Sequence, residues 1–257
     1  TPLIHPQTGT LIMQTYGQAQ HLGVVHLEID ASGRRVAQRG QLVEVQSEHL
    51  QPDPRVAAKL ALYRNMHTDI YTRVGSNAEY LSRRYYEESD LGNLFADILR
   101  TETGAQIGLV PSGALRKDLP MGLVRKIDLL DAFPFEDHVA LVEVSGQLLM
   151  AILEQGLSLE RGLLQVSGLI ATYDPTQPAG QRLLEVRIDG ERLQTNKTYT
   201  IATLEILARG GDAYVQFKEA ESTTMRKPFA EALEAYFGAR DVVEKPQRRR
   251  LIPLDQR

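Results

Sequence analysis

Cysteine is absent from the 257 residues of the chain. This absence excludes disulfide bonds, thiolate catalysis and cysteine-based zinc sites, but it does not decide the cellular compartment. No apolar run approaches the roughly 20 residues that a membrane-spanning helix needs, so we expect no membrane span. Acidic residues outnumber basic ones, and the net charge of −4 argues against a nucleic-acid polymer as the main partner.

Patterns typical of metal ligands are also missing from the sequence. The six histidines are His5, His21, His26, His49, His67 and His138. None of them stands in a His-x-His or Asp-x-His pair. Metal catalysis needs several ligands that converge on one ion, so we interpret each histidine as a structural or surface residue.

Hydrophobic residues make up 42% of the chain, which is ample for a core. Short apolar runs before residue 50 predict strands that are joined by a turn at residues 31–34. Asp53 and Pro54 are typical of the N-cap and first residue of a helix, and apolar residues follow at helical spacing to about Val74. We therefore expect a small β region at residues 1–52, a linking helix at 53–74 and a larger domain at 75–257.

The larger domain alternates strand and helix patterns, which predicts an α+β fold built in layers. Ser89 is a typical N-cap of a helix that Gly104 ends, and Ser145 begins another helix that Gly156 ends. We interpret the basic run from Lys245 to Arg250 as a solvated charge run. Further strands are expected at residues 106–110, 139–144, 163–173, 184–188 and 198–204, and a last helix at 229–237.

The most informative local feature is the sequence Gly210-Gly211-Asp212, which follows the strand expected at 198–204. Glycines allow the backbone to turn sharply and to approach a ligand closely, and the carboxylate that follows can accept hydrogen bonds from it. The same sequence is also common as a tight turn with an Asx cap. Its companions along the chain are residues 89–94 (SDLGNL), 111–118 (PSGALRKD), 128–135 (DLLDAFPF) and 164–169 (LQVSGL).

In their order and spacing these five segments resemble the C-terminal domain of the 5′-nucleotidase family. Its members are metal-dependent hydrolases of nucleotides and include periplasmic UDP-sugar hydrolases and cyclic-nucleotide phosphodiesterases. The resemblance extends from about Ser89 to Tyr214 and implies a layered α/β/β/α domain. Thr1, Pro2 and Leu3 resemble the residues after the closing metal motif of the family's N-terminal metallophosphatase domain. Residues 1–52 are thereby implied to be the last strands of that domain.

The resemblance also implies a division of labour. In the family, two divalent metal ions and the catalytic His-Asp pair belong to the N-terminal metallophosphatase domain, while the C-terminal domain holds a nucleoside or nucleotide. We therefore expect no cofactor in this chain itself, a catalytic domain that lies outside it, and no phosphoester hydrolysis by these residues alone. The resemblance further implies a periplasmic or cell-surface protein that acts in nucleotide catabolism.

Three side chains match family positions that contact substrate. By this resemblance Arg116 contacts the nucleotide, Phe135 is the first ring that stacks on the base, and Asp212 accepts the ribose hydroxyls. Each has an alternative: a surface charge for the arginine, a place in the core for the phenylalanine, and a cap of its own turn for the aspartate. The surrounding loops contribute Gly113, Gly210 and Gly211 to the implied substrate site.

Three other positions depart from the family pattern. Pro111 replaces the loop asparagine, Glu87 lies near the place of an arginine, and Ile206 occupies the place of the second stacking aromatic. Loss of one stacking ring weakens base binding by about 1–3 kcal/mol. Nearby aromatic residues that could supply a substitute ring are Phe133, Tyr214, Tyr85 and Tyr86.

Two functional hypotheses remain open from the sequence. The chain is the substrate-binding portion of a 5′-nucleotidase-like hydrolase, or it is a non-catalytic binding or interaction module on the same fold with a diverged pocket. Weak nucleoside binding that depends on Phe135 or Asp212 favours the first hypothesis. No binding at millimolar concentration favours the second.

Overall fold

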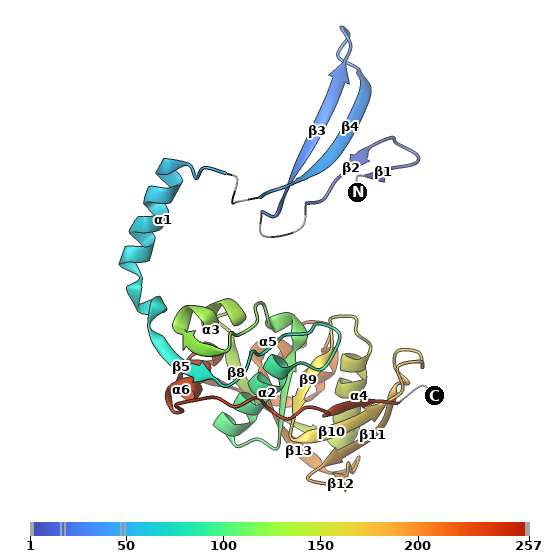
Figure 1. Cartoon of the computed structure of the whole chain (residues 1–257). Coiled ribbons are helices and arrows are strands. Elements are labelled where there is room, and N and C mark those ends of the chain that lie inside the picture. The colour runs from blue at the N-terminus through green and yellow to red at the C-terminus, as the bar shows by residue number, and fades with distance from the viewer. Residues whose placement is uncertain (1–2, 16, 18, 47, 49, 255–257) are drawn as a thin grey trace. The chain divides into compact units, whose positions relative to one another are not determined.

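The computed structural model of the chain describes residues 3–15, 17, 19–46, 48 and 50–254. Thr1, Pro2 and His49, on which parts of the sequence interpretation rest, lie outside these residues. The chain divides into two compact units, Thr1–Met66 and His67–Arg257 (Figure 1).

The first unit contains short antiparallel strand pairs. β3 (His21–Ile29) and β4 (Arg35–Glu44) form a hairpin. Asp30 closes its turn, because Oδ1 accepts hydrogen bonds from the backbone N–H groups of Ser32 and Arg34, both at 2.9 Å. The predicted hairpin turn is therefore present. A second pair consists of β1 (Leu3–Ile4) and β2 (Leu11–Ile12).

The helix of this unit, α1 (Pro54–Met66), is shorter than the sequence predicts. Asp53 caps its start, since Oδ1 accepts hydrogen bonds from backbone N–H groups of the first turn. The prediction of a helix to Val74 is wrong beyond the end of α1. The chain there forms a short 3-10 turn and then β5 (Arg73–Asn77), whose pairing with β7 (Gly122–Arg125) competes with helix formation.

Two sheets form the framework of the second unit. Across the five-stranded sheet the order is β14 (Glu221–Pro228), β8 (His138–Ser145), β13 (Thr198–Leu204), β6 (Ile107–Pro111) and β9 (Leu164–Ser167). Its β13 and β6 run parallel, and the other neighbours run antiparallel. Across the four-stranded sheet the order is β12 (Glu191–Arg192), β11 (Leu183–Ile188), β10 (Leu169–Tyr173) and β15 (Leu251–Pro253).

Helices and sheets in the second unit are layered around two buried clusters. Alternate residues of a strand face opposite sides of a sheet, so β6 sends Val110 into one cluster and Leu109 into the other. The four-stranded sheet and α4 (Gly146–Leu157) pack on one face of the five-stranded sheet. The other face is covered by α2 (Asp90–Thr103), α3 (Lys126–Ala132) and α6 (Phe229–Gly238). The predicted α+β class is confirmed.

Two glycines have roles that differ from the prediction. Gly168 divides the single strand expected at 163–173: its φ is +80°, and a Cβ there would lie 2.0 Å from the carbonyl oxygen of Gln106. The chain passes at this point from β9 in one sheet to β10 in the other. Gly156 does not end its helix but lies inside α4, close to Leu164.

A buried amide, Gln165 on β9, joins three of the segments singled out in the sequence. Its Oε1 accepts a hydrogen bond from the backbone N–H of Ser89 at 2.9 Å. Its Nε2 donates to Oγ of Ser112 at 2.8 Å and to the carbonyl oxygen of Glu87 at 2.9 Å. Because buried polar groups need such partners, this network fixes how the three segments lie together.

The basic tail is bound to the second unit, which corrects the interpretation of a solvated charge run. Arg250 donates from Nη1 to Oδ1 of Asp97 at 2.8 Å and from Nη2 to Oδ2 at 2.7 Å. Lys245 and Arg248 approach the carboxylate of Asp90 at 3.4 and 3.7 Å. Composition indicated the charge of this tail, but the acidic residues of α2 that hold it are more than a hundred residues away in sequence.

Candidate ligand-binding site

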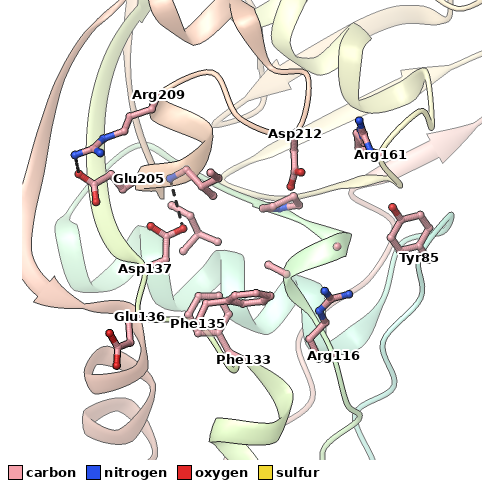
Figure 2. A pocket seen from close by; sticks show the side chains of 15 residues that line it. Tyr85, Arg116, Phe133, Phe135, Glu136, Asp137, Arg161, Glu205, Arg209 and Asp212 are labelled. Atoms are coloured by element: carbon pink, nitrogen blue, oxygen red, sulfur yellow. Dashed lines mark hydrogen bonds and ion pairs between the residues drawn. The ribbon is translucent and has the colours of Figure 1, made fainter. Parts of the chain in front are cut away.

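An open pocket of about 570 Å³ lies at the edge of the five-stranded sheet where β13 and β6 end (Figure 2). These strands are parallel, so their carboxyl ends meet at one edge, a common location for ligand sites. The antiparallel strand β8 begins at the same edge. The pocket is lined by Tyr85, Pro111, Gly113, Ala114, Arg116, Phe133, Phe135, Glu136, Asp137, Arg161, Leu204, Glu205, Ile206, Arg209 and Asp212.

The structure brings most of the predicted site residues together in this pocket. Arg116, Phe135 and Asp212 line it, and so does Gly113. Gly210 and Gly211 are not among the lining residues but form the turn that leads to the aspartate. A single site therefore holds the three side chains that the sequence selected.

Phe135 is a half-exposed ring supported from below. Its side chain is 38% exposed, whereas Phe133 is 1% exposed and belongs to the core. The two rings meet edge to face with centroids 5.5 Å apart. The guanidinium of Arg116 lies 5.4 Å from the centroid of Phe135, within cation–π range. Phe133 therefore occupies the core, and the ring of Phe135 lines the pocket.

Asp212 does not cap its own turn. The turn is closed by backbone hydrogen bonds from Gly210 N–H to Leu207 O at 2.7 Å and from Gly211 N–H to Ile206 O at 2.8 Å. No hydrogen bond or ion pair joins the Asp212 carboxylate to another residue within the described part of the chain. Its φ of +50° is uncommon for a residue other than glycine, and such strain clusters at functional sites. The carboxylate is available to a ligand.

A helical turn that the sequence did not predict precedes this loop. The strand was expected to lead directly into the Gly-Gly-Asp sequence, but α5 (Glu205–Ala208) lies between them. Gly210 has φ +82°, and a Cβ on Gly211 would lie 2.6 Å from the carbonyl oxygen of Ile206. Both glycines are needed for the chain to fold back over α5, because a side chain at the second position would collide with that turn.

The departures from the family pattern lie in different surroundings. Pro111 ends β6 and lines the pocket, and Ile206 lines it with 48% of its side chain exposed. Glu87 does not line it. Among the candidate substitute rings, Tyr85 and Phe133 line the pocket, and Tyr85 is the exposed one at 39%; Tyr214 is buried in the core. Tyr85, which precedes the first segment, is therefore one aromatic ring that reaches the pocket besides Phe133 and Phe135.

Sequence reasoning missed the acidic end of the pocket. Asp137 follows Phe135 by two residues, and its Oδ1 and Oδ2 accept hydrogen bonds from the backbone N–H groups of His138 at 3.0 Å and Ile206 at 3.4 Å. Burial raises the pKa of this carboxyl, and the nearby Glu205 carboxylate raises it further. The sequence could have indicated Asp137, because it lies two positions after Phe135, a predicted site residue.

The sequence analysis also missed two arginines that line the pocket, Arg161 and Arg209. Arg161 precedes β9, and it reaches the pocket because β9 pairs with β6 so that Leu164 lies opposite Pro111. Nothing in a single sequence states which strands pair. Arg209 is bound to Glu205 one turn earlier in α5. Its charge is thereby balanced within the pocket, whereas no ion pair of Arg116 or Arg161 exists within the described part of the chain.

The resemblance places its two metal ions on a metallophosphatase domain and not on the residues described here. Among these residues, no group of three or more histidine, cysteine, aspartate and glutamate side chains could hold a metal ion. Within the same residues, no helix has the length and apolar character needed to cross a membrane.

The fold and the pocket define an α+β domain with a candidate ligand-binding site at one sheet edge, of a size typical for small-molecule pockets. The chain belongs to the family described as "5′-nucleotidase, C-terminal domain", whose sequence profile matches residues 68–219. The family that the sequence segments resemble is thus confirmed.

Individual proteins are similar over longer stretches. "Trifunctional nucleotide phosphoesterase protein YfkN" of Bacillus subtilis is 28% identical over 238 residues, which are 85% of this chain and 16% of that protein. "Cell wall protein Lmo0130" of Listeria monocytogenes is 28% identical over 165 residues, 58% of this chain and 21% of that protein. The crystal structure of a 5′-nucleotidase precursor from Thermus thermophilus matches with TM-score 0.86 and 25% identity, covering 100% of this chain and 54% of that one. The chain spans less than half the length of the curated relatives it matches.

Proposed function

We propose that this chain is the nucleoside- or nucleotide-binding portion of a 5′-nucleotidase-like, metal-dependent phosphoester hydrolase. The observation that carries the proposal is the meeting of Arg116, Phe135 and Asp212 in one pocket of a domain of this family. The names of the relatives that act on nucleotides support it.

Each of the three side chains has a chemical task in the proposed complex. The exposed face of Phe135 stacks on the base, because every base offers a π-face. The carboxylate of Asp212 accepts hydrogen bonds from the ribose hydroxyls. Arg116 and Arg161 offer guanidinium groups, which bind phosphate oxygens with two hydrogen bonds at a time. Figure 2 shows both arginines on the side of the pocket where Asp212 lies.

The chemistry itself is proposed to take place on another domain. A metallophosphatase domain with two divalent metal ions would supply the attacking water and stabilise the phosphoryl group. We expect the chain described here to bind nucleotides without hydrolysing them. We also propose that the protein is exported to the periplasm or cell surface and acts in nucleotide catabolism; a relative named as a cell wall protein supports the location.

Calorimetric titration tests the proposal. The chain is titrated with adenosine, uridine and guanosine 5′-monophosphates, and the same titrations are run on Asp212→Ala and on the control Asp241→Asn, which alters an exposed carboxyl outside the pocket. Binding that Asp212→Ala weakens by about tenfold, as expected for lost hydrogen bonds to a charged group, supports the proposal. No binding of any nucleotide at millimolar concentration contradicts it and favours a non-catalytic interaction module.

A further inference from the structure

One carboxylate in the pocket has no task in the proposed complex so far. Asp137 lies two residues beyond Phe135, just before β8 begins. Figure 2 shows its carboxylate and the Phe135 ring in the same pocket, with the Glu136 side chain directed away from both. A flat group stacked on the ring would therefore present its edge to this carboxylate.

The hydrogen bonds of Asp137 leave room for a ligand. An ionised carboxylate has about four acceptor positions, two on each oxygen. The backbone N–H of His138 occupies one position on Oδ1, and that of Ile206 occupies one on Oδ2, the latter at a long 3.4 Å. Each oxygen retains at least one free lone pair, and the two backbone contacts hold the carboxylate in a fixed orientation. Two parallel N–H donors are the group that such a carboxylate binds best.

The distribution of charged side chains in the pocket favours one orientation of a bound nucleotide. In Figure 2 Asp137 and Glu205 lie on one side of Phe135, and Arg116 and Arg161 lie on the other. Arg209 also lines the pocket, but its guanidinium is bound to Glu205. A nucleotide with its phosphate at the two unpaired arginines would thus have its base edge at the acidic side.

We propose that Asp137 is a specificity-determining residue that selects a base with two adjacent N–H donors, as guanine has on its ring nitrogen N1 and its exocyclic N2. This inference rests on the proposed function, because it concerns the same pocket. The substrate class is accordingly guanine nucleotides.

The other common bases fit this carboxylate less well. Adenine offers one amino donor beside a ring nitrogen that is an acceptor, so one carboxylate oxygen would face a lone pair. Cytosine has the same arrangement, and uracil has a single N–H between two carbonyl groups. Hypoxanthine keeps the ring N–H of guanine but lacks the exocyclic amino group, which makes inosine monophosphate a graded probe.

Titration of the chain with the 5′-monophosphates of guanosine, inosine and adenosine tests the inference. The wild-type chain is expected to bind the guanosine nucleotide roughly fivefold to 150-fold more tightly than the adenosine nucleotide, the range for one bidentate pair, with inosine between them. Asp137→Asn places an amide donor and acceptor at the same position, so the preference should vanish or turn towards adenosine. Asp241→Asn removes an equal charge outside the pocket and should leave the ratio unchanged.

The outcomes separate this inference from the proposed function. If the adenosine nucleotide binds as tightly as the guanosine nucleotide, or if Asp137→Asn keeps the original ratio while its thermal unfolding shows a folded protein, Asp137 does not select the base. If none of the three nucleotides binds to the wild-type chain, the proposed function fails and this inference fails with it.

Discussion

The guanidinium of Arg116 lies 5.4 Å from the centroid of the Phe135 ring. The backbone helps to hold this pair, because the N–H of Arg116 donates to the carbonyl oxygen of Ala132 at 2.8 Å, three residues before the ring. The loop after β6 and the segment before β8 are therefore joined at the pocket. The ring and the charge to which we assign base stacking and phosphate binding are thus held together by the fold, which would reduce the ordering that binding requires.

Phe135→Ala should weaken nucleotide binding without unfolding the protein. The ring is half exposed, and Phe133 rather than Phe135 occupies the core position. Loss of one stacking contact weakens binding by about 1–3 kcal/mol, which is roughly fivefold to 150-fold in Kd by calorimetry. Phe135→Tyr keeps the π-face and serves as the control. Unchanged affinity in the alanine variant would show that the base does not lie on this ring.

Gly211→Ala should disturb the loop that carries Asp212. The added Cβ would lie 2.6 Å from the carbonyl oxygen of Ile206, so α5 or the loop must move. We expect a lower Tm together with weaker nucleotide binding. Gly113→Ala is a matched control for stability, because its Cβ would be 3.8 Å from the nearest atom, Cε2 of Tyr85. A Gly211→Ala variant that melts like the control would contradict the steric argument.

Arg250→Ala should destabilise the second unit, although the sequence alone predicts a solvated tail. The side chain is 14% exposed and makes two hydrogen bonds to the Asp97 carboxylate on α2. Hydrogen bonds to charged groups contribute about 1.5–3 kcal/mol to the free energy of unfolding. Urea unfolding measures the loss. Arg249→Ala is the control, since the side chain of this exposed neighbour makes no hydrogen bond or ion pair in the described part of the chain. Equal free energies of unfolding in the two variants would indicate that the Arg250–Asp97 hydrogen bonds do not stabilise the second unit.

Local signals in the sequence predicted some helix boundaries, but not the end of α1. The cap of α2 is one case: Oγ of Ser89 accepts a hydrogen bond from the N–H of Gly92 at 3.1 Å, and Gly104 ends the helix in the left-handed conformation. Features that depend on distant partners were missed. β5 forms because β7 is its neighbour, and the short helix α3 (Lys126–Ala132) begins where that pair ends.

The residues of the candidate site also fall into two groups, those that local sequence predicts and those that only distant strand pairing brings to the pocket. Phe135 and Asp212 stand in recognisable local sequences, so their positions could be predicted before any fold was known. Arg161 could not be predicted, because only the pairing of β9 with β6 brings it to the pocket. Tyr85 is similar: its carbonyl oxygen accepts a hydrogen bond from the N–H of Leu163 at 2.8 Å, a contact between segments far apart in sequence.

Asp137→Asn should stabilise the protein near neutral pH. Burial raises the pKa of this carboxyl, and the Glu205 carboxylate raises it further. The backbone hydrogen bonds from Ile206 and His138 and the charge of His138 lower it, but less than burial raises it. Above the raised pKa the folded state holds a partly desolvated charge, which lowers stability. Below the ordinary pKa of an aspartate the carboxyl is neutral in both states, and the penalty is absent.

The expected gain in Tm is therefore present at about pH 7 and shrinks as the pH falls towards about 4. Thermal unfolding over this range measures it. Asp241→Asn, at an exposed carboxyl, should show no such trend. A gain that grows on acidification would mean that the carboxylate is stabilised, not penalised, in the folded state.

A crystal structure of the chain with guanosine 5′-monophosphate tests the central claim most directly. The account predicts the base against the ring of Phe135 with its N1–N2 edge at Asp137, the ribose hydroxyls at Asp212, and the phosphate at Arg116 and Arg161. A nucleotide bound elsewhere on the chain, with this pocket empty, would contradict it.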